Sequence, residues 1–75
     1  MKKAELIEQG YQPMPGTKGV YVKTEGDIVH LAFDAGQNFG PSSSGKTITV
    51  CSTSGNKGID TPVGEIKIGL NAYHY

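Results

Sequence analysis

The sequence predicts a single α+β domain over residues 1–75, with a short N-terminal helix packed on a four-stranded antiparallel β-sheet. Three observations predict this fold. A chain of 75 residues is long enough for one domain only. One stretch near the N-terminus has apolar residues at helical spacing, and four later stretches alternate apolar with polar residues. Because strands that follow each other in sequence are usually neighbours, we expect an up-and-down meander.

The helix is predicted over residues 2–9 and ends at Gly10, a residue type that commonly terminates helices. A helix this short is marginal by itself, so we expect it to pack on the sheet. Its apolar residues form one stripe, which consists of Ala4, Leu6, Ile7 and Tyr11.

The first two strands are predicted over residues 19–24 and 27–34, joined by a two-residue turn at Glu25-Gly26. This turn pairs Thr24 with Asp27 and aligns the two strands so that their apolar residues share one face. The residues that the register brings together on that face are Val20, Val22, Val29, Leu31 and Phe33.

Two further strands are predicted over residues 46–52 and 64–74, and Gly-, Ser- and Asn-rich loops connect the strands at 35–45 and 53–63. Strict alternation then assigns each side chain to one of two faces. The face under the helix carries Val20, Val22, Val29, Leu31, Ile48, Val50, Ile66 and Ile68. The mixed outer face carries Tyr21, Lys23, Ile28, His30, Thr49, Cys51, Lys67, Asn71 and Tyr73.

Composition narrows the classes of function. Seven lysines balance seven acidic residues, and arginine is absent, which argues against a strongly basic nucleic-acid-binding protein. A single cysteine excludes an internal disulfide. The N-terminus lacks the apolar stretch of a signal peptide, and no apolar run reaches the length of a membrane span. We therefore expect a soluble cytoplasmic protein that does not contact a membrane.

One motif suggests nucleotide chemistry. Residues 40–47, Gly-Pro-Ser-Ser-Ser-Gly-Lys-Thr, match the phosphate-loop pattern at every required position. This segment resembles the nucleotide-binding loop of small-molecule and nucleotide kinases. The resemblance implies an anion site at Gly45, Lys46 and Thr47, with Lys46 on the phosphates and Thr47 on magnesium. In that family a helix begins at the lysine, whereas here β-branched residues follow and predict a strand. We therefore expect a Gly/Ser loop without enzymatic activity.

Other groups that could carry chemistry are few. His30 and Cys51 share the predicted outer face, whereas His74 has core parity and Asp34 has no ligand-like spacing to either. We interpret them as isolated side chains and expect neither a metal site nor a cofactor. Glu25 and Asp27 flank the predicted turn, where acidic residues are usually solvated.

The outer face gives the most specific hypotheses about function. Tyrosines beside lysines suit an interface between copies of the chain, so we expect a small non-enzymatic binding module that forms a homodimer through this face or an edge strand. The alternative is a protein that binds single-stranded nucleic acid by ring stacking and phosphate contacts. That site would consist of Tyr21, Lys23, His30, Lys67 and Tyr73. A third hypothesis is nucleotide binding through residues 40–47.

Overall fold

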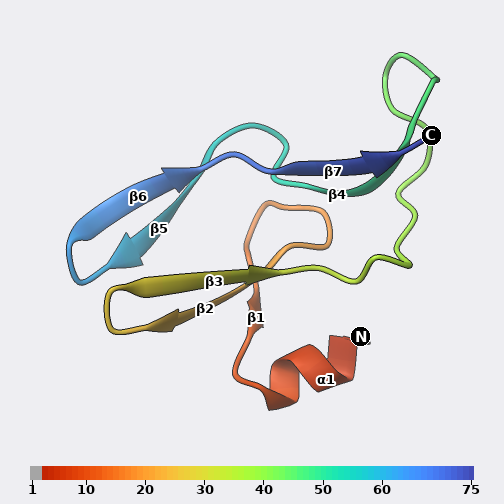
Figure 1. The fold of residues 1–75 in the computed structure, drawn as a ribbon. Helices are drawn as coiled ribbons and strands as arrows, with labels where there is room; N and C mark the ends of the chain where they lie inside the picture. Colours follow the sequence, from red (N-terminus) through yellow and green to blue (C-terminus); the bar gives the residue numbers. More distant parts are fainter. Residues whose placement is uncertain (1–2) are drawn as a thin grey trace.

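The computed structural model describes residues 3–75, which form one short helix and seven strands in three antiparallel sheets (Figure 1). The expected combination of one N-terminal helix with antiparallel strands is confirmed, but the four-stranded meander is wrong. The sheets are β1-β2-β3, β4-β7 and β5-β6. The elements are α1 (Lys3–Glu8), β1 (Gln12–Pro13), β2 (Tyr21–Glu25), β3 (Ile28–Ala32), β4 (Ile48–Ser52), β5 (Lys57–Thr61), β6 (Gly64–Ile68) and β7 (Asn71–His74).

The predicted fourth strand is divided in two. It breaks at Gly69 and Leu70, so that β6 pairs with β5 and β7 pairs with β4. Buried Thr53 forms hydrogen bonds with Leu70 at this break. Its backbone N–H donates to the Leu70 carbonyl at 2.9 Å, and its Oγ1 accepts the Leu70 N–H at 3.0 Å. The region 53–63 was predicted to be a loop, but it contains β5, which is the first strand of a second hairpin.

The β2–β3 hairpin forms with a different turn from the predicted one. Glu25 pairs with Ile28, so the central turn residues are Gly26 and Asp27 rather than Glu25 and Gly26. Gly26 has φ 58°, and a positive φ at the first central position favours glycine and suits the twist of a hairpin. The pairing is shifted by two residues, which preserves the face of every side chain. Val22 now lies opposite Leu31, still on the apolar face.

The core lies between the first hairpin and the C-terminal strands. Met14, Val20 and Cys51 form a buried cluster. Partly buried apolar residues from β2, β5, β6, β7 and the residue before β7 pack against it: Val22, Ile59, Ile68, Leu70 and Ala72. The helix was predicted to cover the apolar face of β2, but the other strands cover this face. Instead, α1 lies on the opposite side of the β2–β3 hairpin (Figure 1). Tyr21 alternates with Val20 and Val22 and therefore keeps its predicted side, but it is only 7% exposed and is buried within the chain.

A β-bulge changes the faces of β4. Thr49 pairs with Tyr73 and Cys51 pairs with Ala72, which leaves Val50 as an extra residue between them. A bulge breaks strict alternation, so two consecutive side chains can point to the same side. Val50 and Cys51 are both buried, and Cys51 is therefore in the core and not on the outer face as predicted. No helix in the described part of the chain is long and apolar enough to cross a bilayer.

Candidate functional site

The phosphate-loop-like segment forms a β-hairpin with a four-residue loop. The Ser42 N–H donates to the Thr47 carbonyl at 2.8 Å, and the Thr49 N–H donates to the Gly40 carbonyl at 3.0 Å. A bridge between Pro41 and Ile48 lies between these two bonds. The prediction that a strand follows Lys46 is confirmed, because β4 begins two residues later. The helix that places a positive dipole end against phosphates in true phosphate loops is therefore replaced by an extended segment.

Hydroxyl groups within this loop bind one another. Thr47 Oγ1 donates to Ser42 Oγ at 2.8 Å, and Ser42 Oγ lies 3.1 Å from Ser44 Oγ. Ser44 Oγ also accepts the Lys46 backbone N–H at 3.4 Å. The Thr47 hydroxyl, which would hold magnesium in the kinase loop, here stabilises the hairpin loop. These bonds give the loop a defined shape and leave the Lys46 ammonium group exposed at its edge.

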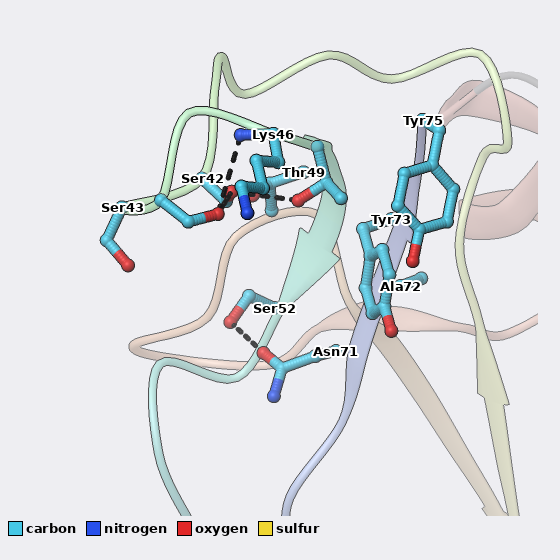
Figure 2. A pocket seen from close by; sticks show the side chains of 11 residues that line it. Ser42, Ser43, Lys46, Thr49, Ser52, Asn71, Ala72, Tyr73 and Tyr75 are labelled. Carbon is cyan, nitrogen blue, oxygen red and sulfur yellow. Dashed lines mark hydrogen bonds between the residues drawn. The ribbon is translucent and has the colours of Figure 1, made fainter.

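The loop forms one wall of a pocket of about 460 Å³, a volume typical of small-ligand sites. Figure 2 shows the loop serines and Lys46 on one side of the pocket and Tyr73 and Tyr75 on the other. Ser52 and Asn71 lie below them, where Ser52 Oγ donates to Asn71 Oδ1 at 2.7 Å. The full lining is Ser42, Ser43, Ser44, Lys46, Thr47, Thr49, Ser52, Asn71, Ala72, Tyr73 and Tyr75.

Strand geometry places the two tyrosines on the same side. Residues two apart in a strand project from one face, which brings Tyr73 and Tyr75 together at the end of β7. Their ring centroids are 6.2 Å apart, and the rings meet edge to face at 81°. Tyr73 is 57% exposed and Tyr75 is 92% exposed, so both rings offer faces to a ligand. Because the Val50 bulge keeps Thr49 opposite Tyr73, the neighbouring strand contributes a hydroxyl beside these rings.

The electrostatic character of the pocket is set by one cation. Its lining contains no Asp, Glu or His side chain, and Lys46 carries its single charged side chain. Hydroxyl groups, the Asn71 amide and the tyrosine phenols complete a neutral polar surface. A site with an ammonium group, many hydroxyls and exposed aromatic rings favours ligands that combine an anionic group with a flat ring.

The residues that were predicted to bind nucleic acid lie apart from one another in the structure. Lys23 and His30 are cross-strand partners on the first hairpin, and both contact Glu25, at 3.2 and 3.4 Å. The Lys23 ammonium also lies 4.9 Å from the centre of the Tyr11 ring. Lys67 lies on β6 and forms an ion pair with Glu65 at 2.9 Å.

Of that predicted set, Tyr73 alone lines the pocket, and buried Tyr21 has little surface for a ligand. Two of the three residues of the predicted anion site, Lys46 and Thr47, meet Tyr73 there, whereas Gly45 is not among the lining residues. The sequence analysis thus assigned residues of this one pocket to two separate predicted sites, Lys46 and Thr47 to the anion site and Tyr73 to the nucleic-acid site. Ser52 was missed because strict alternation from Ile48 and Val50 gives it the parity of the core face, whereas the Val50 bulge and the pairing of β4 with β7 bring it beside Asn71.

The groups considered for nucleophilic or metal chemistry remain separate. Cys51 is fully buried, and this desolvation raises the pKa of its thiol, an effect that a hydrogen bond with the Ala72 backbone partly opposes. A raised pKa disfavours the reactive thiolate. His74 Nδ1 lies 3.2 Å from the Tyr75 carbonyl, outside the lining of the pocket. Within residues 3–75, no cluster of three or more His, Cys, Asp or Glu side chains could hold a metal ion.

Comparison of the chain with protein-family models, with curated proteins and with solved structures finds no match.

Proposed function

We propose that the chain is a non-enzymatic binding module whose pocket holds one nucleotide unit of a single-stranded nucleic acid. One observation carries the proposal: the same pocket contains two exposed tyrosine rings and the Lys46 ammonium group, with a hydroxyl-rich surface between them. A nucleotide has a matching pair of features, because its base is a flat ring and its phosphate is an anion.

The aromatic half of the pocket suits a base. Stacking of a base on an aromatic side chain contributes about 1–3 kcal/mol and is tolerant of sequence, because every base has a π-face. Tyr73 and Tyr75 meet edge to face, so one base can stack on either ring while its edge approaches the other. Asn71 and Ser52 lie below the rings, where their polar groups can hydrogen-bond to a base edge or a sugar hydroxyl.

The polar half suits a phosphate. Lys46 supplies the positive charge, and the adjacent serines supply hydroxyl donors. An acidic side chain would repel phosphate, and no Asp or Glu lines the pocket. Carboxylates and imidazoles are also the usual general bases, so the same composition favours binding over catalysis. With one cation in the site, affinity for a strand should be modest and should fall with salt with a logarithmic slope of about −0.7.

The test is an amide-shift NMR titration of the labelled protein with a short oligothymidine and, in a separate arm, with thymidine monophosphate. Binding of the oligonucleotide should move the amide resonances of residues 42–47 and 71–75. A response to the oligonucleotide alone identifies a strand as the ligand, whereas equal responses identify a free nucleotide. If neither ligand shifts these resonances at low salt, the proposal is refuted.

Paired variants locate the contacts. Tyr75→Ala should weaken oligonucleotide binding about fivefold or more, because it removes one stacking ring. The matched control is Phe39→Ala, since Phe39 is also exposed but lies outside the lining. Lys46→Ala should weaken binding and abolish most of the salt dependence. Lys67→Ala, on β6, should change neither, and an equal effect of both lysine variants would contradict the assignment of the pocket.

A further inference from the structure

Strand β3 is an edge of its sheet that the fold leaves unprotected. In the sheet β1-β2-β3 it pairs with β2 on one side, and no other described strand pairs with its second side. Native proteins protect such edges with Lys, Pro, bulges or very short strands. The sequence of β3 is Ile-Val-His-Leu-Ala, which has four apolar residues and none of these devices.

The other free edges differ in this respect. The opposite edge of the same sheet, β1, has two residues and contains Pro13. Both strands of the β5–β6 hairpin carry charged residues and glycine. Strand β7 has four residues, of which Asn71 and His74 are polar. Strand β4 is also uncharged, but isolated bridges of Ser52 with Lys18 and of Ile48 with Pro41 occupy its second side. A five-residue uncharged edge with no bridge on its free side is thus found in β3 among the described strands.

Apolar side chains near this edge remain exposed to solvent. Leu31 and Phe33 are each 39% exposed and, two residues apart, project to the same face as Val29. Ile66 of the facing hairpin is 42% exposed. The core therefore covers the β2 side of the first hairpin and leaves its β3 side open.

The dimensions of the chain agree with an incomplete core. Its accessible surface is 4964 Å², whereas a monomeric protein of this mass exposes about 4,400 Å². Its radius of gyration is 13.0 Å, compared with about 11.3 Å for a compact domain of 75 residues. The excess surface is about 550 Å² per chain by the same scaling.

We propose that a second copy of this chain pairs with the outer edge of β3, antiparallel and about a two-fold axis. The two three-stranded sheets then become one six-stranded sheet, and both copies satisfy the free backbone groups of the same strand. Burial of the excess surface on both copies removes about 1,100 Å², which is just above the lower limit of roughly 1,000 Å² for a biological interface.

The apolar pattern also fits this pairing. A two-fold axis through His30 places Val29 of one copy opposite Leu31 of the other, so their apolar faces coincide. Leu31, which is half-exposed in one copy, then lies opposite Val29 of the second copy and diagonal to its Leu31. The pocket belongs to other elements, β4, β7 and the loop 42–47. Failure of either proposal therefore leaves the other one standing.

Sedimentation equilibrium of the whole chain tests the dimer. The parent protein should have twice the mass of one chain. Leu31→Lys should halve this mass, because each introduced ammonium group would lie against Val29 of the other copy in the apolar interface and diagonal to the second ammonium group. The matched control is Val63→Lys, which places the same charge on an exposed apolar position at the tip of the β5–β6 hairpin. This variant should remain a dimer.

Amide hydrogen exchange of the parent protein gives a second measurement that needs no variant. The outward-facing amides of β3 should exchange more slowly at high than at low protein concentration, whereas those of β6 should not change. A parent protein that is monomeric at high concentration overturns the proposal, as does a dimer in which Leu31→Lys has no effect. A dimer that protects the amides of β7 instead would also overturn it.

Discussion

Replacement of Val20 by alanine should cost a large part of the stability of this domain. Val20 is 1% exposed and lies in the buried cluster with Met14 and Cys51. The substitution removes two methylene equivalents, which are worth about 1.6 kcal/mol of transfer free energy. The cavity that remains adds about 1 kcal/mol, because so thin a core has few neighbours that can collapse into it. The expected loss is therefore about 2–3 kcal/mol.

That loss is large beside the total stability, which for 75 residues is about 4–11 kcal/mol. Urea denaturation followed by circular dichroism should show a lower midpoint with an unchanged slope. The melting temperature should fall by about 10–20 °C. All variants should be compared at one protein concentration, because association would make the stability depend on it.

Val63→Ala provides the matched control, since it makes the same substitution at a position that is 69% exposed. Its cost should remain within about 0.5 kcal/mol. If Val20→Ala and Val63→Ala destabilise the protein equally, Val20 does not occupy the core that the structure shows. Met14 and Cys51, which contact Val20 in the buried cluster, would then not form the core either.

Two further predictions concern the interior. Burial raises the pKa of the Cys51 thiol, so its contribution to the unfolding free energy should be fully present at neutral pH. This contribution should be lost as the pH rises above 9.0, the ordinary pKa of a cysteine thiol. In urea titrations at several pH values, Cys51→Ala should lose less unfolding free energy over that range than the parent protein. Gln37 Nε2 donates to the carbonyls of Gly19 and Val50, both at 3.2 Å, so Gln37→Ala should cost about 1–2 kcal/mol, whereas exposed Gln12→Ala should cost little in the same thermal melts.

The sequence was sufficient to predict the helix, the first hairpin and β4, but not β5 or the partners of the C-terminal strands. Alternation identified the first hairpin and β4, and it assigned the correct faces to Val20 and Val22, because a register error of two residues preserves parity. It did not reveal the break at Gly69-Leu70, since Leu70 continues the apolar alternation across it. The break depends on long-range bonds from Thr53, and a local pattern contains no sign of them.

The candidate site was predicted in pieces for the same reason. Lys46 and Thr47 were identified by a motif, and Tyr73 by its place on a strand, but their proximity depends on the pairing of β4 with β7. Lys23 was expected to be free for a ligand, yet it is engaged by Glu25 and by the Tyr11 ring. Tyr11 belongs to the segment after the helix, whose approach to the hairpin no periodicity could show.

The Val50 bulge links the core to the proposed site. Without the extra residue, strict alternation would keep Val50 inside and turn Cys51 outward, or the reverse. The bulge lets both side chains fill the core while Thr49 and Ser52, on either side of them, still line the pocket opposite Tyr73 and Asn71. The Gln37 side chain fixes the bulge by binding the Val50 carbonyl. A substitution that loosens this bond should therefore disturb the binding surface as well as the core, although Gln37 itself does not line the pocket.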